Sequence, residues 1–381
     1  MPCARRRRDA AGTGGGDACG IPAGSSRRGS GCMPLTAPGE PDWSANEVLS
    51  REECAGRAIV LASRPQFLIV DPTSRCNARC VMCHVSFRPP IEHGHDLPRG
   101  IFEKIAPLLC TARHVNLFAT GEPTIARDIL FFLEEAGKRS HETAQIWLCT
   151  NGKRLPGDLL DRLADPRMGL QFSVDGGTPE VFEAIRRGIS FDELCRSLAL
   201  ANARRGASRF PAFSFSSTIS KRNVHDIANI FALAARYRVE QVLFYEEDPE
   251  APEEEQYQLD ESDRPVFEAQ LSFIESTGIR YWNGLTFRGP SSRLPPVHAG
   301  AAPEGPMRCL APWKVFYVRA DGSVRTCCTL RSSMGDLGAQ SFEEVWNGAA
   351  YTRLRRAFVE QTSFPDACLT CTDPLRTWGE P

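Results

Sequence analysis

The 381-residue sequence lacks any long apolar run and any strong excess of charge of one sign. No stretch approaches the roughly 18 uninterrupted apolar residues of a membrane-spanning helix. Nucleic-acid binding needs a concentrated basic face, and the formal net charge of -2 gives no sign of one. Residues 5–8 are all Arg, and Gly, Ser and Asp follow them where a signal peptide would have an apolar region. We therefore expect a cytoplasmic protein with neither a membrane nor a nucleic-acid partner.

Short apolar runs alternate with amphipathic stretches from Gln66 onward. Residues 1–48, in contrast, are rich in Gly, Ser, Arg and Pro, which predicts a disordered N-terminal tail. Strands are predicted at 67–71, 114–119, 145–149, 169–174, 212–217 and 240–245. Helices are predicted at 98–110, 126–138, 155–165, 178–205, 223–237 and 260–277. The alternation predicts βα units, a parallel sheet and the α/β fold class.

Six βα units predict a partial (β/α)6 TIM-like barrel over residues 49–278. Residues 279–308 are rich in Pro and Gly and are interpreted as a linker. Residues 309–381 then form a small C-terminal domain, which needs a metal centre to be stable. In α/β barrels the chemistry lies on loops at the carboxyl ends of the strands. Candidate site residues should therefore follow the predicted strands.

The loop after the first predicted strand carries three cysteines, Cys76, Cys80 and Cys83. Three thiolates on one tight loop can hold three irons of a cubane cluster. The fourth iron is then open to the amino and carboxylate groups of a ligand such as S-adenosylmethionine (SAM). The alternative is a zinc site that the adjacent His84 completes. The position directly after a strand of a βα repeat favours the cluster.

This Cys-x-x-x-Cys-x-x-Cys loop resembles the hallmark of the radical SAM superfamily, and the resemblance extends from about Phe67 to Cys371. It implies a SAM-binding 4Fe-4S cluster and reductive cleavage of SAM to a 5′-deoxyadenosyl radical that abstracts hydrogen from a substrate. The family often has an aromatic residue where this chain has Met82, and Met can also pack against adenine.

Polar motifs after the later strands resemble SAM-contacting positions of the same family. Thr120, Gly121, Glu122 and Pro123 match its Gly-Gly-Glu-Pro motif, which receives the SAM ammonium group, with Thr120 in place of the first glycine. Further cofactor contacts are predicted from the matching positions Thr150, Asn151, Ser173, Asp175 and Ser217. The alternative for these polar residues is local capping of loop backbone.

Charged residues near the barrel mouth are candidates for substrate binding. Arg186 can bind substrate oxygens, although helical arginines are usually solvated. Glu246, Glu247 and Asp248 follow the sixth strand and form either a solvated acidic loop or a surface that attracts a cationic substrate such as an amino sugar.

The C-terminal segment contains a second set of cysteines, Cys309, Cys327, Cys368 and Cys371. A hairpin is predicted from strands 314–319 and 323–327, and a helix over 342–358. The layout resembles the SPASM/Twitch auxiliary domain of radical SAM enzymes and implies a second, auxiliary 4Fe-4S cluster in the shorter Twitch form. A four-cysteine zinc ribbon is the alternative.

The remaining cysteines have no such spacing. Cys328 is an extra thiol beside a ligand, and the resemblance makes it a base, a surrogate ligand or a packed thiol. Small buried apolar side chains are predicted for Cys54, Cys110, Cys149 and Cys195. Free surface thiols are predicted for Cys3, Cys19 and Cys32.

An auxiliary cluster without an open iron suits electron transfer. The first hypothesis is therefore a dehydrogenase that oxidises a carbinol of a sugar or aminocyclitol, supplied with electrons by a flavodoxin- or ferredoxin-type donor. The cysteine layout is most similar to the aminocyclitol dehydrogenase of the butirosin pathway. The alternatives are a peptide-modifying enzyme, an epimerase or decarboxylase, and a zinc-binding interaction protein.

Overall fold

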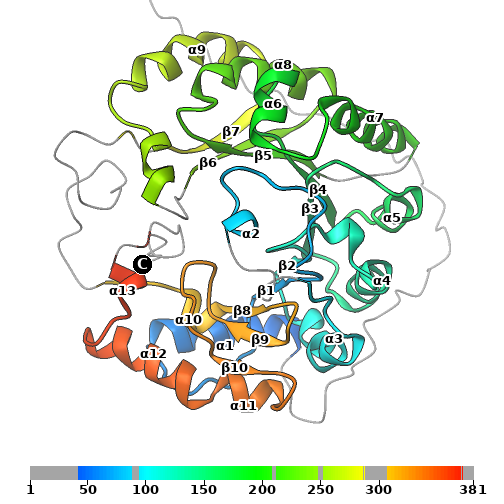
Figure 1. Ribbon diagram of the computed structural model, residues 1–381. Coiled ribbons are helices and arrows are strands. Elements are labelled where there is room, and N and C mark those ends of the chain that lie inside the picture. The colour runs from blue at the N-terminus through cyan, green and yellow to red at the C-terminus, as the bar shows by residue number, and fades with distance from the viewer. Residues whose placement is uncertain are drawn as a thin grey trace, which may run out of the picture.

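A single twisted sheet forms the centre of the protein in the computed structural model (Figure 1). The structure describes residues 42–369 and 371, apart from 88–93, 208–211, 248–251, 286 and 288–306. Within these residues the sheet has the strand order β10-β9-β8-β1-β2-β3-β4-β5-β6-β7. No helix among them is both long enough and apolar enough to cross a membrane.

The six predicted strands are consecutive parallel strands of this sheet, and the predicted α/β barrel-like class is confirmed. They are β1 (Phe67–Val70), β2 (His114–Asn116), β3 (Gln145–Thr150), β4 (Met168–Ser173), β5 (Ala212–Ile219) and β6 (Gln241–Glu246). Each is hydrogen-bonded in parallel to the next. The longer helices that follow these strands are α3 (Arg99–Ile105), α4 (Ile129–Arg139), α5 (Gly157–Arg162), α6 (Pro179–Ile185), α7 (Phe191–Ala207), α8 (Ile227–Arg236) and α9 (Arg264–Ser276).

Side-chain alternation along each strand separates an outer core from an inner face. In β6, Phe244 is fully buried and packs against Phe231 of α8. The next residue, Tyr245, is 42% exposed on the opposite face of the sheet. The helices therefore cover the outer face, as Figure 1 shows, and the inner face is left for the loop that follows β1.

Two predicted boundaries are wrong. Residues Arg280–Gly284, which were assigned to the linker, form a seventh parallel strand, β7, paired with β6. Its sequence, Arg-Tyr-Trp-Asn-Gly, is mostly half-buried or exposed, so it lacks the apolar run that marks the central strands. The predicted disordered tail ends too late, because Trp43–Ala55 form helix α1. The rest of that tail and most of the linker lie outside the described residues.

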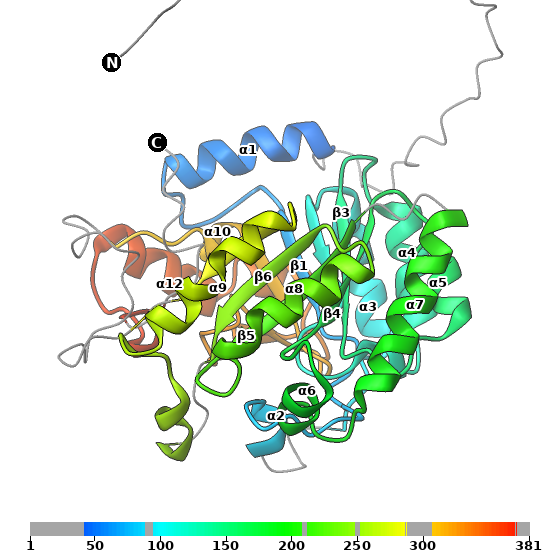
Figure 2. The same cartoon turned by 90° about the horizontal axis from the view of Figure 1, so that it is seen from above.

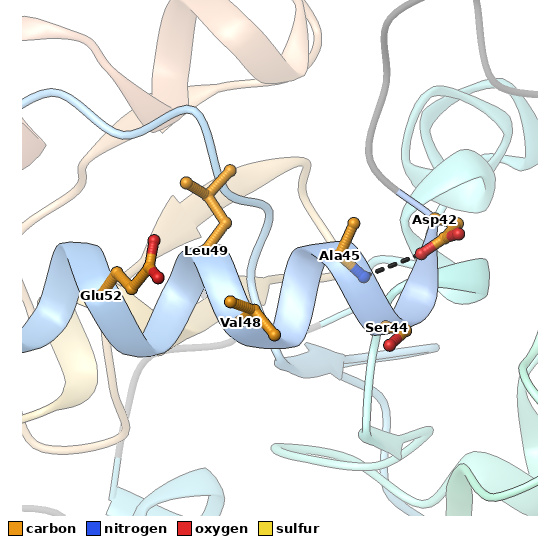
Figure 3. Close-up of a pocket in the computed structure, with 6 residues that line it drawn as sticks. All are labelled: Asp42, Ser44, Ala45, Val48, Leu49 and Glu52. Atoms are coloured by element: carbon orange, nitrogen blue, oxygen red, sulfur yellow. Dashed lines mark hydrogen bonds between the residues drawn. The ribbon is translucent and has the colours of Figure 1, made fainter.

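Helix α1 begins at a side-chain cap and closes one end of the barrel. The carboxylate of Asp42 accepts a hydrogen bond from Ala45 N at 2.7 Å, and a shallow hollow beside this cap is lined by residues of α1 and Asp42 alone (Figure 3). Trp43 stacks on His141, with ring centroids 4.3 Å apart. Figure 2 shows α1 at the end of the sheet opposite to α2 (His84–Phe87), which leaves the α2 end for the chemistry.

Two predicted helices are divided. The segment predicted as one helix over 178–205 forms α6 and α7, separated at Gly188, whose φ of 86° is readily adopted only by glycine. The segment predicted at 342–358 forms α11 (Phe342–Trp346) and α12 (Ala349–Glu360).

The C-terminal segment continues the barrel sheet. The predicted hairpin is present as the antiparallel strands β8 (Val315–Val318) and β9 (Ser323–Arg325), followed by β10 (Gly335–Asp336). All four residues of β8 also pair in parallel with β1. This pairing joins the C-terminal cysteines to the strand that carries the first cysteine loop.

Buried polar contacts secure this junction. Arg355 of α12 is fully buried, donates to Pro312 O at 2.8 Å and to Ile59 O at 3.1 Å, and lies over the Trp346 ring. Tyr351 OH donates to Val315 O at 2.9 Å. Because these donors satisfy carbonyls from segments far apart in the sequence, the two parts of the chain form one packed unit.

Candidate active site and cysteine clusters

A cavity of about 350 Å³ lies at the carboxyl ends of the parallel strands. Each of β1 to β6, or the loop that follows it, contributes lining residues. The three cysteines predicted as cluster ligands, Cys76, Cys80 and Cys83, all line this cavity. So do Gly121, Glu122, Thr150, Asn151, Ser173 and Arg186, which were proposed for cofactor or substrate.

The cysteine loop is shaped by backbone hydrogen bonds. Cys83 N donates to Cys80 O at 3.2 Å, which closes a tight turn just before α2. Arg79 N donates to Arg187 O at 2.8 Å, and Val81 N donates to Ile185 O at 2.9 Å. The loop is thereby fastened to the end of α6.

Hydrogen-bond donors point at two of the three sulfurs. Asn151 Nδ2 lies 3.8 Å from Cys76 Sγ, and Arg186 Nη1 lies 4.0 Å from Cys80 Sγ. Burial raises the pKa of Cys80 to about 12, while the positive charge of Arg186 lowers it. Donors at these positions stabilise thiolates that bind iron. The set of three sulfurs, two of which have donors behind them, therefore fits a cluster that keeps one iron open.

Gly121 packs directly on the backbone that leads to Cys76. Its N–H donates to Thr73 O at 3.1 Å. A Cβ at this position would overlap the carbonyl oxygens of Thr73 and Arg75. Only glycine allows this close approach, so Gly121 determines how the β2 loop lies against the cysteine loop.

The carboxylate of Glu122 is occupied by protein donors. It accepts hydrogen bonds from the Thr124 backbone and hydroxyl, from Thr150 Oγ1 at 2.7 Å and from Asn151 N at 2.7 Å. Burial raises its pKa, and these four donors lower it. Glu122 therefore fastens the β2 loop to the end of β3, which in turn holds Asn151 towards Cys76.

Arg186 is buried and not solvated. It follows the last residue of α6, its side chain is 11% exposed, and its Nε lies 2.6 Å from the fully buried carboxylate of Asp175. Asp175 also accepts a hydrogen bond from Thr218 N at 2.8 Å. The alternative of a solvated helical arginine is wrong for this residue, because the ion pair and the Cys80 thiol hold it inside the site.

Three predicted cofactor contacts are not among the described residues that line the cavity: Pro123, Asp175 and Ser217. Ser217 is fully buried and donates to Val174 O at 2.5 Å, while its neighbour Thr218 lines the cavity. The residue-by-residue alternation of β5 puts these two side chains on opposite faces, and a motif match cannot resolve that register.

Sequence reasoning missed Cys149. It was predicted to be a buried apolar side chain, yet it lines the cavity, with its Sγ 3.4 Å from Ser173 Oγ. Burial raises its pKa to about 11, so it is a thiol at neutral pH. Its place directly before the Thr150-Asn151 motif on an inward-facing strand position was the available signal.

The acidic residues at the end of β6 and directly after it are only partly available to a substrate. Glu246 and Glu247 line the cavity. Glu247, however, is 3% exposed and accepts a hydrogen bond from Arg222 at 2.6 Å, and Arg222 also pairs with Glu254. A solvated acidic loop is therefore wrong for Glu247, while Asp248 lies outside the described residues.

The second cysteine set surrounds a separate small apolar hollow. Cys309, Cys327, Cys368 and Cys371 all line it, together with Leu330 and Phe358. Leu330 N donates to Cys327 Sγ at 3.3 Å. Four sulfurs around one hollow fit an auxiliary iron–sulfur cluster that is held by four cysteines. Cys328 is exposed and lines neither this hollow nor the cavity.

The chain carries a radical SAM domain, because the model of the radical SAM superfamily matches residues 70–234. More particularly, it carries a SPASM domain, described as an iron–sulfur cluster-binding domain, over residues 309–372. These matches support iron–sulfur clusters over the zinc alternatives. The cofactors are therefore a SAM-binding 4Fe-4S cluster, SAM, and auxiliary iron–sulfur chemistry, and the two cysteine sets offer sulfurs that fit as ligands.

Similarity to individual proteins is moderate. Mycofactocin maturase MftC of Mycobacterium tuberculosis (strain CDC 1551 / Oshkosh) is 32% identical over 176 residues, which span 45% of this chain and 42% of that protein. The match thus covers less than half of that relative. AdoMet-dependent heme synthase of Methanosarcina barkeri (strain Fusaro / DSM 804) is 23% identical over 312 residues, or 78% of this chain and 86% of that protein.

The fold is shared with solved radical SAM structures. Streptococcus suis SuiB bound to its precursor peptide SuiA has a TM-score of 0.59 at 15% identity, over 86% of this chain and 73% of that chain. At this identity the likeness shows the fold alone.

When bound, the cluster and SAM together supply a radical that removes a hydrogen atom from a substrate carbon.

Proposed function

We propose that the chain is a radical SAM oxidoreductase that oxidises a carbon centre of its substrate in the cavity, with the second cysteine set holding the electron acceptor. The observation that carries this proposal is the parallel pairing of β1 with β8 over four residues. It lays the hairpin that immediately precedes Cys327 against the strand that leads into the Cys76 loop. Oxidation of the substrate radical that hydrogen abstraction leaves would need an electron acceptor within electron-transfer distance of the cavity.

We propose a peptide as the substrate. MftC is named a maturase, and the SuiB structure contains a precursor peptide, which supports a peptide for this chain by relationship and by fold. A flavodoxin- or ferredoxin-type protein would supply the electron that starts each turnover.

A second candidate substrate is a hydroxylated small molecule, either a sugar or an aminocyclitol. Glu246 favours it, because a carboxylate that lines the cavity attracts an ammonium group. On this alternative the enzyme is a dehydrogenase of a carbinol. Epimerisation and decarboxylation would begin with the same hydrogen abstraction, but epimerisation then needs a hydrogen donor and decarboxylation needs loss of CO2 and of one electron.

Deuterium transfer distinguishes these substrates. The reduced holoenzyme and SAM are incubated separately with deuterated short peptides encoded beside the gene and with deuterated amino sugars and aminocyclitols. Deuterium in 5′-deoxyadenosine from a peptide supports the first proposal, and deuterium from an alcohol carbon supports the second. A product at the oxidation level of the substrate would contradict oxidation for either class.

A further inference from the structure

A buried carboxyl group, Asp71, lies between the cavity and the auxiliary hairpin. It follows β1 directly, and its N–H donates to Val318 O of β8 at 2.8 Å. The residue is 1% exposed. Its Oδ1 accepts a hydrogen bond from Thr120 N at 3.1 Å, whereas its Oδ2 is buried without a hydrogen-bond partner in the described part of the chain. An unsatisfied carboxylate oxygen in such a place is costly and calls for an explanation.

Thr120 connects this carboxyl group to the cavity. Thr120 lines the cavity, while its backbone N–H donates to Asp71 Oδ1 and its side chain lowers the pKa of the Asp71 carboxyl group. Its hydroxyl oxygen lies 3.4 Å from the hydroxyl of Tyr317, which is buried on β8 opposite Ile69. A threonine hydroxyl donates one hydrogen bond while it accepts others. It can therefore receive a proton on one side and release one on the other.

The electrostatic surroundings suit proton exchange near neutral pH. Burial raises the pKa of Asp71 to about 6, even though Thr120, Gly121 and the positive charge of Arg319 lower it. Tyr317 faces the same carboxyl group, and burial raises the pKa of its phenol, so it stays neutral. A carboxyl group with a pKa near the working pH is well suited to accept a proton.

We propose that Asp71 is the proton acceptor of this active site and that Thr120 passes the substrate proton to it. The step moves one proton and no electron. The bond from the substrate to its proton breaks as the Thr120 hydroxyl oxygen takes that proton. The original hydroxyl proton of Thr120 then passes to the Asp71 carboxylate. Thr120 is unchanged, the carboxylate becomes a carboxylic acid, and Tyr317 holds the Thr120 hydroxyl in place. The proposal rests on the oxidative function above, because oxidation of a C–H group releases a proton.

The first test needs no substrate. Infrared difference spectra of the reconstituted holoenzyme are recorded between about pH 4 and 8, where a carboxyl group with a raised pKa titrates. We expect a buried carboxylic acid band with a midpoint near 6, absent in Asp71→Asn, and shifted to higher pH in Thr120→Val. Asp321→Asn is the matched control, because Asp321 also lies near Arg319 but its pKa is lowered. No titrating band, or no shift in Thr120→Val, overturns the proposal.

The second test measures the role. With the substrate identified by deuterium transfer, product formed per 5′-deoxyadenosine is followed against pH. We expect Asp71→Asn to lower this ratio about 100-fold or more, as loss of a general base does, and to abolish its rise through pH 6. Thr120→Ser retains the ratio and Thr120→Val loses it. A ratio that Asp71→Asn leaves unchanged overturns the proposal, whereas a lack of deuterium transfer in the unmodified enzyme contradicts only the oxidative function.

Discussion

Arg186 and Asp175 form a buried ion pair directly behind the Cys80 thiol. Nε of Arg186 lies 2.6 Å from Asp175, and Nη1 lies 4.0 Å from Cys80 Sγ. Two hydrogen bonds hold Asp175 in turn. Its carboxylate accepts one from Thr218 N, and its backbone carbonyl accepts one from Asn223 Nδ2 at 2.8 Å. One guanidinium thus joins the ends of β4 and α6 to the cysteine loop, which makes it a positioning group for the cluster.

Because the ion pair is buried, we expect removal of one partner to lower the free energy of unfolding strongly. Arg186→Gln leaves the Asp175 carboxylate buried without its cation, so we expect a loss of about 3–5 kcal/mol in unfolding free energy. The double variant Arg186→Gln/Asp175→Asn should recover part of that loss. Urea unfolding of anaerobically reconstituted protein measures both. Equal stability of the single and the double variant would show that the pair is not coupled.

Gly121 predicts a steric effect. Gly121→Ala places a methyl group against the carbonyls of Thr73 and Arg75, so we expect displacement of the β2 loop and at least a tenfold weaker binding of SAM, about 1.4 kcal/mol. Gly100→Ala is the control, since its Cβ would meet nothing within 4 Å and it lies inside α3. There we expect a gain of about 0.5–1 kcal/mol in stability. Isothermal titration with SAM and thermal unfolding compare the two variants.

The two cysteine sets predict separable losses of iron. Anaerobically reconstituted protein should hold about eight irons, as two four-iron clusters require. Cys80→Ser and Cys368→Ser should each retain about half of the iron. Only Cys80→Ser should abolish the change in the electron paramagnetic resonance spectrum on addition of SAM. Cys110→Ser, outside both hollows and hydrogen-bonded to Pro107 O, should behave as the unmodified protein. Zinc in place of iron would contradict the assignment.

Asp71 predicts a pH dependence of stability. Its pKa is raised from 3.8 to about 6, so the folded protein binds this proton more tightly than the unfolded chain does. Its contribution is therefore fully present below about pH 4 and is lost as the pH rises through 6, a change of about 3 kcal/mol. Asp71→Asn should remove this loss, so its stability relative to the unmodified protein should increase between pH 4 and 7. Parallel unfolding curves for the two proteins across that range would contradict the shift.

Glu122 predicts loss of the loop geometry when its second oxygen is removed. Glu122→Gln replaces one acceptor by an NH2 group, which then faces the donors Thr124, Thr150 or Asn151. We expect about 1–3 kcal/mol of destabilisation and a weaker contact between Asn151 and Cys76. Glu103→Gln on the exposed side of α3 is the control and should change stability by less than about 0.5 kcal/mol. Thermal unfolding and SAM titration measure the difference.

Local patterns determined much of this protein. The alternation of apolar runs and amphipathic stretches predicted β1 to β6, and cysteine spacing predicted both sets that the structure gathers around their hollows. Such features depend on residues close together in the chain, so the sequence alone carries them. β7 was missed because its edge position needs no apolar run.

Only the tertiary structure decided what the polar residues do. The pairing of β1 with β8, the burial of Arg186 against Cys80, and the hydrogen bonds from Thr150 and Asn151 to Glu122 each join segments that are distant in sequence. The same is true of Asp71, which no motif marked and which β8, Thr120 and Arg319 surround. Packing of remote segments sets the dielectric surroundings and the partners of a side chain. These determine whether the side chain caps a loop, links two loops by hydrogen bonds or accepts a proton.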